Sequence, residues 1–264
     1  MITATAAIAL VTYPAAAAAQ QNPYLPLPEE CPQPQNTIVG TQGNDLRSGT
    51  PLNDAMYGFG GHDVFEAMAG DDCLLMGGGN DRAVSNEGDD VIFGETGSDQ
   101  LSGNDDSDRI SGGAGNDQLD GGDDNDGIGG DAGADRLVGG GGRDRLRADS
   151  GADVLSGGAS ADEGTAGSGD DRVSGGPGND ILSGSRGEDR VSGNSGNDEL
   201  TGGPDDDRVV GGGGRDRLSG AGGDDTIHAR DGSRDRVNCG RGRDRARVDR
   251  TDRVSSNCEI VRRG

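Results

Sequence analysis

Apolar side chains recur every nine residues along most of the chain, and this spacing predicts one short strand in each repeat. Among the twenty-one positions from 47 to 227 that are spaced by nine, nineteen are apolar, and the exceptions are Arg47 and Gly164. A three-residue strand would turn its central side chain inward and both neighbours outward. The expected inner stack includes Leu101, Ile110, Leu119, Ile128, Leu137, Leu146, Leu155, Val173, Leu182, Val191, Leu200, Val209, Leu218 and Ile227.

An aspartate lies two residues before each of these positions, without an insertion between Asp45 and Asp225. Glycine lies two residues before that aspartate in sixteen of the twenty-one repeats. Residues 112–120 and 175–183 show the full pattern G-G-x-G-x-D-x-U-x, in which U is apolar. Glycine lets a six-residue turn direct its carbonyls at a cation, and aspartate adds the hard oxygen ligand that Ca²⁺ prefers.

Two nine-residue repeats make one coil of 18 residues, so each aspartate faces the aspartate 18 residues further along. Asp99, Asp117 and Asp135 would line one edge, while Asp108 and Asp126 would line the other. Carboxylates stacked at strand spacing repel one another unless a divalent ion lies between them. The sequence therefore predicts that calcium binding supplies part of the folding free energy.

The composition also indicates that the carboxylates must be neutralised. The chain has 264 residues, of which 53 are glycine, and its formal charge is −24 because 48 acidic residues face 24 arginines and no lysine. Such a chain is typical of a disordered polyanion unless its carboxylates are compensated. The negative charge also argues against nucleic acid or an anionic membrane as a partner.

At these residues the sequence resembles the hemolysin-type calcium-binding (RTX) repeat proteins. The resemblance implies an all-β, right-handed parallel β-roll over residues 37–228, with Ca²⁺ between turns on the same side and carbonyls such as those of Gly112, Ala114 and Gly175 completing the shells. Carried over position by position, it implies these metal ligands: Asp63, Asp72, Asp81, Asp90, Asp99, Asp108, Asp117, Asp126, Asp135, Asp144, Asp153, Asp171, Asp180, Asp189, Asp198, Asp207, Asp216 and Asp225.

Two repeats depart from the motif, and we expect weak or absent ions there. The repeat around Asp54 lacks turn glycines, and the repeat around Asp162 lacks both the second glycine site and the inward hydrophobic residue. Members of the family that are enzymes carry a separate catalytic region, whereas little of this chain lies outside the repeats. The chain is therefore similar to secreted, repeat-only members. Since it has two histidines and no H-E-x-x-H, G-x-S-x-G or P-loop, we expect no enzymatic activity.

The segments outside the repeats have their own predicted roles. Residues 1–19 read as a secretory signal peptide, with a disordered Ala-rich tail as the alternative, and the Pro- and Gln-rich residues 20–36 as an extended linker. The register slips by one residue before Asp235, and residues 229–264 form an Arg-rich segment that we expect to cap the roll. We expect a secreted, extracellular monomer without a membrane span.

Four cysteines lie in two pairs at opposite ends of the repeats, and three pairings are conceivable. A stack of ten or so coils would separate its ends by roughly 50 Å, beyond the reach of a disulfide. We therefore predict bonds between Cys31 and Cys73 and between Cys239 and Cys258. A zinc site is the disfavoured alternative because no C-x-x-C occurs.

Arginine follows the motif aspartate in several repeats, which places it on the outer face of a strand. These residues are Arg109, Arg136, Arg145, Arg172, Arg190, Arg208 and Arg217. The favoured interpretation is a solvated face that offsets the acidic turns. The alternative is an adhesion or matrix scaffold whose arginines bind a sulfated or carboxylated cell-surface or matrix polymer.

Overall fold

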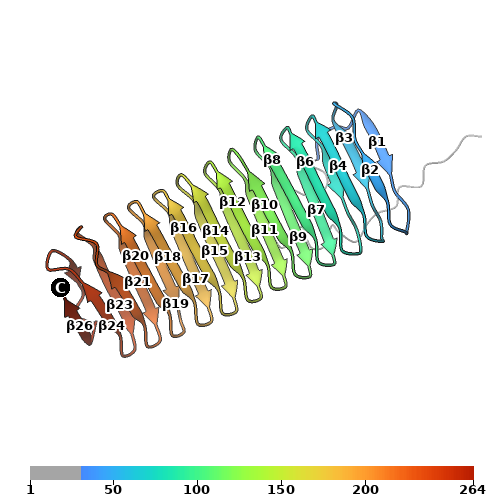
Figure 1. Cartoon of the computed structure of the whole chain (residues 1–264). Helices are drawn as coiled ribbons and strands as arrows, with labels where there is room; N and C mark the ends of the chain where they lie inside the picture. The colour runs from blue at the N-terminus through green and yellow to red at the C-terminus, as the bar shows by residue number, and fades with distance from the viewer. Residues whose placement is uncertain (1–30) are drawn as a thin grey trace, which may run out of the picture.

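The computed structural model describes residues 31–264, which form two parallel β-sheets and contain no helix (Figure 1). The predicted signal peptide and residues 20–30 of the predicted linker lie outside the described residues. Within residues 31–264 there are 26 strands, and each sheet has 13 of them. Odd-numbered strands form one sheet, here the odd sheet, and even-numbered strands form the other, the even sheet.

The bounds of the strands follow the nine-residue repeat. The odd sheet contains β1 (Asn36–Val39), β3 (Asp54–Tyr57), β5 (Cys73–Leu75), β7 (Val91–Thr96), β9 (Arg109–Ala114), β11 (Gly127–Ala132), β13 (Arg145–Ser150), β15 (Glu163–Ser168), β17 (Ile181–Arg186), β19 (Glu199–Gly203), β21 (Arg217–Gly222), β23 (Arg236–Arg241) and β25 (Arg253–Val254). The even sheet contains β2 (Leu46–Ser48), β4 (Val64–Ala69), β6 (Arg82–Glu87), β8 (Gln100–Asp105), β10 (Gln118–Gly122), β12 (Arg136–Gly141), β14 (Val154–Ala159), β16 (Arg172–Pro177), β18 (Arg190–Ser195), β20 (Arg208–Gly213), β22 (Thr226–Ala229), β24 (Arg245–Val248) and β26 (Ile260–Arg263).

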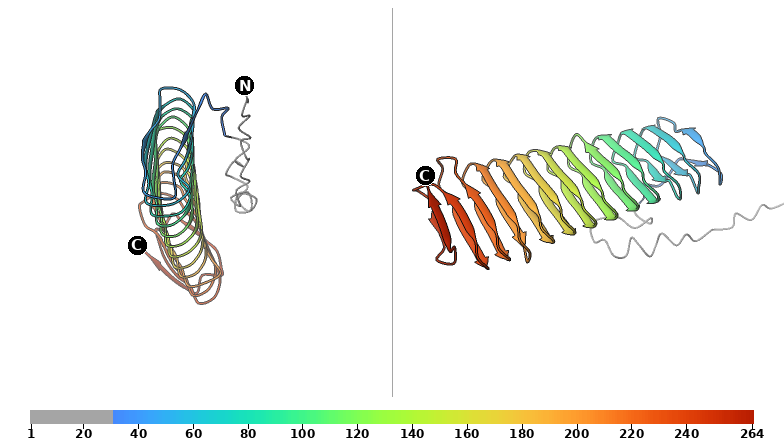
Figure 2. Two further views of the ribbon diagram at one scale, coloured as in Figure 1. Left: turned by 90° about the vertical axis from the view of Figure 1, so that its right-hand side faces the viewer. Right: turned by 60° about the horizontal axis from the view of Figure 1, so that its bottom comes forward.

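Up to β22, each coil of the roll takes 18 residues, as the repeat predicts. Strand β10 pairs in parallel with β8 and β12, and Leu119 lies opposite both Leu101 and Leu137. The end-on view shows flattened coils stacked along one axis (Figure 2). The predicted all-β parallel β-roll is therefore confirmed.

The strands are longer than the three residues that the spacing predicts. Most span six residues, so that β9 continues through the first two glycines of the motif to Ala114. The backbone remains paired because Gly113, at φ +99°, takes a conformation that glycine adopts readily. As a consequence, the carbonyl of Ala114 accepts a hydrogen bond from the Gly97 N–H at 2.8 Å, which occupies one of its two lone pairs.

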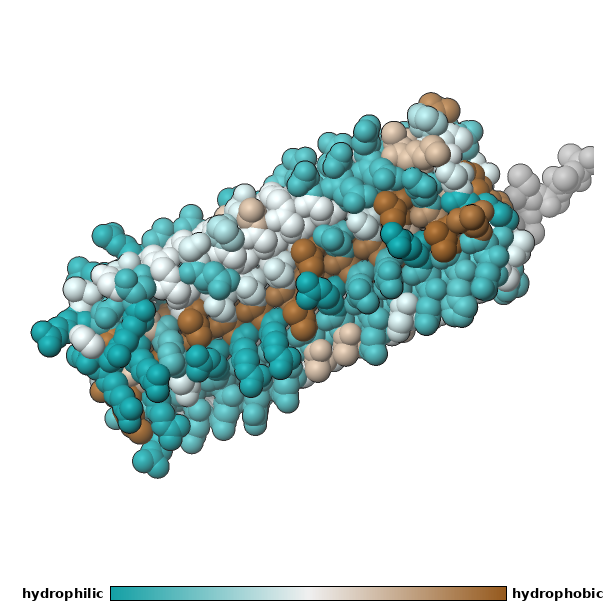
Figure 3. Space-filling view, viewed as in Figure 1, coloured by the Kyte–Doolittle hydropathy of each residue, from teal (hydrophilic) through white to brown (hydrophobic). Residues whose placement is uncertain are grey.

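A thin core fills the space between the two sheets. The inward residues of the predicted stack are buried, and the largest fully buried side chains include Phe65 and Met56 near the N-terminal end. At Gly164, where the stack lacks a side chain, Leu182 Cδ2 lies 2.9 Å from the position that a Cβ would take. Figure 3 shows a band of apolar residues that runs along the visible face between more hydrophilic rows.

Both ends of the roll carry the predicted disulfides, Cys31–Cys73 and Cys239–Cys258. The segment predicted as a cap, residues 229–264, adds β23 to β26 to the same two sheets. The one-residue slip is absorbed in a 19-residue coil, since Arg236 pairs with Arg217. The last residue of the predicted linker, Asn36, begins β1. In the part of the chain that the structure describes, no helix is long and apolar enough to cross a membrane.

Candidate metal centre

The motif aspartates form two ladders, one along each inner edge of the roll. The backbone N–H of each aspartate donates to Oδ1 of the aspartate one coil further along. The Asp99 N–H donates to Asp117 at 2.8 Å on one edge, and the Asp108 N–H donates to Asp126 at 2.8 Å on the other. All the aspartates predicted as ligands lie in these ladders and are at most 3% exposed. One oxygen of each carboxylate is thus committed to holding the coils together.

The second oxygen of each predicted ligand, Oδ2, is buried and has no hydrogen-bond partner. An unpaired buried polar atom costs about 1–3 kcal/mol, and more when it belongs to a charged group. Native proteins contain few such atoms, whereas this chain carries a row of them on each edge. These orphaned oxygens are the strongest indication that the turns bind a cation.

The pKa values of the ladder carboxyls also indicate that their negative charge is not compensated. The pKa of Asp108 is raised to about 9: burial is the main cause, the hydrogen bond from the Asp90 N–H opposes it, and the charges of Asp90 and Asp126 add to it. Burial likewise raises the pKa of Asp90 to about 8 and that of Asp99 to about 7. The ionised ladder is therefore unfavourable unless a positive charge compensates it.

Most of the orphaned oxygens adjoin a gap left by a glycine. We call the residue five positions before each ladder aspartate the inner turn residue, because it points into the roll at the start of the turn. A Cβ built on Gly94 would lie 2.5 Å from Asp99 Oδ2 and 2.5 Å from the carbonyl oxygen of Gly112, in the next coil. The predicted carbonyl of Gly175 lies in the same way beside Asp162 Oδ2.

The oxygens around each gap suit a hard cation. The donors are a carboxylate oxygen and a backbone carbonyl, with no nitrogen or sulfur among them, and Ca²⁺ takes six to eight such oxygens. Within residues 31–264, no three side chains of His, Cys, Asp or Glu come together as a metal cluster. A cation in these turns would therefore depend on backbone carbonyls and water for most of its shell.

Some ladder residues were not predicted as ligands from the sequence. Asp162, Asp235 and Asp244 are buried in the ladders with orphaned Oδ2 atoms, just as the predicted ligands are. The missing hydrophobic residue at Gly164 does not disturb Asp162, because Leu182 fills the gap. The continuing nine-residue spacing from Asp235 to Asp244 was the available signal for these two.

The first two rungs differ because threonines satisfy their carboxylates. Asp45 Oδ2 accepts hydrogen bonds from the Thr41 N–H at 2.6 Å and the Thr41 hydroxyl at 2.9 Å. Asp54 Oδ2 accepts from the Thr50 N–H at 2.6 Å. These two turns therefore have no orphaned Oδ2.

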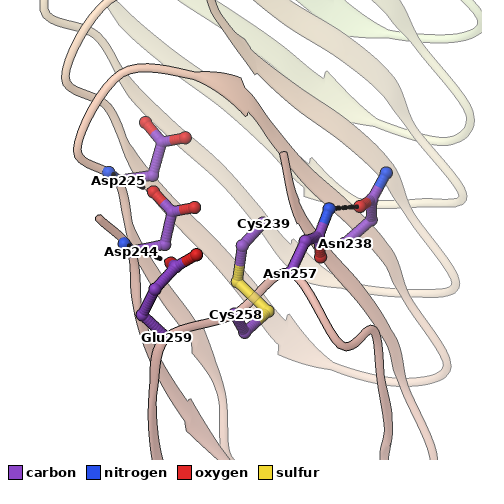
Figure 4. Close-up of a disulfide and its surroundings, with 7 residues drawn as sticks. All are labelled: Asp225, Asn238, Cys239, Asp244, Asn257, Cys258 and Glu259. Carbon is purple, nitrogen blue, oxygen red and sulfur yellow. Dashed lines mark hydrogen bonds between the residues drawn. A yellow bond between two sulfur atoms is a disulfide. The ribbon is translucent and has the colours of Figure 1, made fainter. Parts of the chain in front are cut away.

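The ladders end within the last coil. On one edge, the Asp225 N–H donates to Asp244 Oδ1 and the Asp244 N–H donates to Glu259 Oε2 at 2.9 Å, beside the disulfide of Cys239 and Cys258 (Figure 4). On the other edge, the Asp235 N–H donates to Asp252 at 3.0 Å, and the Asp252 N–H turns back to the Asp249 carbonyl. Glutamate thus replaces aspartate as one final rung.

Comparison with known proteins identifies a family and similar solved structures. The family described as RTX calcium-binding nonapeptide repeat (4 copies) matches residues 48–74, 75–110, 93–128, 102–137, 129–163, 165–200 and 201–235. No curated protein matches the chain. A similar solved structure is the X-ray crystal structure of a hyperactive, Ca²⁺-dependent, β-helical antifreeze protein from an Antarctic bacterium. It has 19% sequence identity and a TM-score of 0.35, over 85% of this chain and 82% of that chain.

Proposed function

Because the chain belongs to the RTX calcium-binding nonapeptide repeat family, we propose that it is a secreted, extracellular calcium-binding protein whose roll folds as calcium enters the turns. The ladder aspartates predicted from the sequence, together with Asp162, are the candidate ligands. Each offers its Oδ2, and carbonyls such as that of Gly112 add neutral oxygens. Bound calcium would supply the positive charge that the ladders lack.

The observation that carries this proposal is the row of orphaned Oδ2 atoms on each edge. Without a cation, folding must either bury ionised carboxylates or protonate them, and both states are unfavourable at neutral pH. Binding only to the folded coils would therefore couple ion uptake to folding. Binding calcium in the turns requires no catalytic group. We expect the chain to be a monomeric binding protein and not an enzyme.

The test is far-UV circular dichroism of the purified chain in chelator and in millimolar calcium, with magnesium at the same concentration as the control. We expect a β signal that appears with calcium and not with magnesium, because Mg²⁺ demands tighter geometry and releases its water reluctantly. An unchanged β signal in excess chelator at neutral pH would contradict calcium-coupled folding.

A second candidate function is the scaffold that binds an anionic polymer, and the arginines of the even sheet favour it. Arg172, Arg190 and Arg208 lie directly opposite one another on β16, β18 and β20, and all three are exposed. On the odd sheet, Arg145 and Arg217 lie 3.6 and 4.0 Å from glutamates, and a second row of opposed arginines, Arg217, Arg236 and Arg253, lies only at its C-terminal end. Like charges stacked on adjacent strands are destabilising, and a polyanion lying across them would relieve that repulsion.

The matched variants for this second candidate come from the two faces. The calcium-loaded chain would be applied to immobilised heparin and eluted with salt. Replacing Arg172, Arg190 and Arg208 with glutamine should lower the eluting salt concentration. The same replacement of Arg109, Arg145 and Arg147 on the odd sheet, none of which lies opposite another arginine, should leave it largely unchanged. Equal effects from the two triple variants, or no retention of the wild-type chain, would refute the scaffold role.

A further inference from the structure

The inner turn residues divide the roll into a middle with open gaps and two ends in which side chains fill the gaps. In the middle, from the turn of Asp99 to the turn of Asp225, the inner turn residue is glycine except at Ala148 and Ala166. Towards the N-terminal end, three successive turns carry Ala67, Met76 and Ser85 instead. At the C-terminal end the spacing changes, and the inward residues are Ala229, Cys239 and Val248, which lie six, five and four positions before Asp235, Asp244 and Asp252.

These side chains occupy the place where a glycine turn leaves room beside the carboxylate. All eight residues are fully buried, and all except Ser85 belong to the main hydrophobic core. The Ser85 hydroxyl donates to the carbonyl of Gly103 at 3.1 Å. In the turn of Asp99, the equivalent carbonyl belongs to Gly112 and faces the open gap. A methyl group or larger side chain in this place excludes a cation from contact with Oδ2.

The two ends also have other means of holding their coils together. Each end contains one of the two disulfides, and disulfides stabilise the fold without a cation. Near the N-terminal end, Phe65 gives the core a larger side chain than the valines and leucines of the middle, and Met56 and Leu74 are fully buried beside it. At the outermost N-terminal rungs, Thr41 and Thr50 already satisfy the ladder carboxylates.

We propose that the cation sites are restricted to turns with an inner glycine, so that calcium orders the middle of the roll while the two ends stay folded without it. This inference rests on the proposed calcium binding and specifies which turns take part. It removes the following predicted ligands from the set that contacts an ion: Asp72, Asp81, Asp90, Asp153 and Asp171. In the N-terminal end, the turn of Asp63 keeps Gly58 and remains an isolated open site.

The first test counts bound ions by native mass spectrometry in matched variants of the middle. Gly139→Ala with Gly157→Ala fills the gaps beside Asp144 and Asp162, and Ala148→Gly with Ala166→Gly opens those beside Asp153 and Asp171. Neither Gly139 nor Gly157 has a positive φ, so φ allows alanine there, but a Cβ would press on the aspartate carboxylate and the carbonyl of the next coil, which must shift to make room. We expect two fewer ions in the filled variant and two more in the opened variant than in the wild type.

The outcomes separate this rule from calcium binding itself. Equal, non-zero counts in all three proteins would overturn the rule and leave the proposed function intact. No bound calcium on any of them would overturn both. If the filled variant fails to fold, the opened variant still tests the rule, since it only removes methyl groups. Asp144→Asn is a substitute for the filled variant, because it keeps Gly139 and removes the charged ligand.

The second test is amide hydrogen exchange of the full chain in chelator and in calcium. In chelator we expect strands β3 to β6 and β23 to β26 to keep their protection, while β8 to β21 exchange at least about tenfold faster than in calcium. A uniform response along the whole roll, whether loss or retention of protection, would overturn the division into ends and middle.

Discussion

Replacing Asp108 with asparagine should have opposite effects on stability with and without calcium. The variant keeps Oδ1 as the acceptor for the Asp90 N–H and removes only the orphaned, ionisable oxygen. An amide group in that place would donate to the Gly121 carbonyl, which adjoins the same gap. Without calcium the substitution removes a penalty, and with calcium it removes a ligand.

The size of the calcium-free effect follows from the pKa of Asp108. The folded pKa is raised from the ordinary value of 3.8 to about 9, so the folded chain binds one more proton than the unfolded chain between these values. Stability is therefore full below about pH 4 and falls as the pH rises. At pH 7 the loss is about 4 kcal/mol, which the asparagine variant would avoid. With calcium at 100 times its dissociation constant, losing one site would cost about 2.7 kcal/mol.

The assay is urea denaturation followed by circular dichroism at pH 4.5 and pH 7, in chelator and in calcium. If the wild type is already unfolded in chelator at pH 7, the stabilisation appears as a higher pH at which the variant loses its fold. Asp105→Asn is the matched control, because Asp105 is exposed and the same charge is removed three residues away. Stabilisation of similar size by both variants, or destabilisation by Asp108→Asn in chelator at pH 7, would refute this reasoning.

Three further predictions follow from the core, the ladders and the disulfides. Leu119→Ala should lower the free energy of unfolding by about 2–5 kcal/mol in calcium, because Leu119 is 2% exposed within the thin core, and urea denaturation would measure this. In chelator, the β signal of the wild type should rise as the pH falls from 8 towards 4.5, since the raised pKa values of the ladder carboxyls favour the protonated folded state; in calcium it should change little over the same range. Replacing Cys239 and Cys258 with serine should speed hydrogen exchange in β25 and β26 while leaving β10 and β12 unchanged, and a uniform change would contradict a local role for this disulfide.

The fold could be predicted well because one rule of spacing is repeated without interruption. The 18-residue coil fixes which strands pair, and the pairing of Leu101, Leu119 and Leu137 follows directly from it. The disulfides followed from the same geometry, since only cysteines at the same end of a long stack can meet. In each case the prediction depends on distances along the roll and not on details of the backbone.

The details of the turn could not be predicted in the same way. A glycine pair allows both a wide turn and a strand that continues through a positive φ, and the sequence does not distinguish these at Gly113. The hydrogen bond from the Gly97 N–H to the Ala114 carbonyl therefore could not be predicted. The motif also does not reveal that Leu182 fills the space at Gly164, or that Asp162 lies in the ladder with an orphaned Oδ2. These outcomes depend on contacts between coils, which the pattern of one repeat does not contain.

The way in which the aspartate ladders end also bears on the length of the assembly. A repeating roll could in principle stack end to end into a fibre, because each coil presents the same donors and acceptors to the next. Here the first two Oδ1 atoms already have partners, Asp45 Oδ1 in Arg47 at 2.6 Å and Asp54 Oδ1 in the Thr50 hydroxyl at 3.3 Å, and at the other end the Asp252 N–H is turned back on its own chain. A second molecule therefore meets no vacant rung at these positions, and growth into filaments is discouraged by the terminal residues themselves.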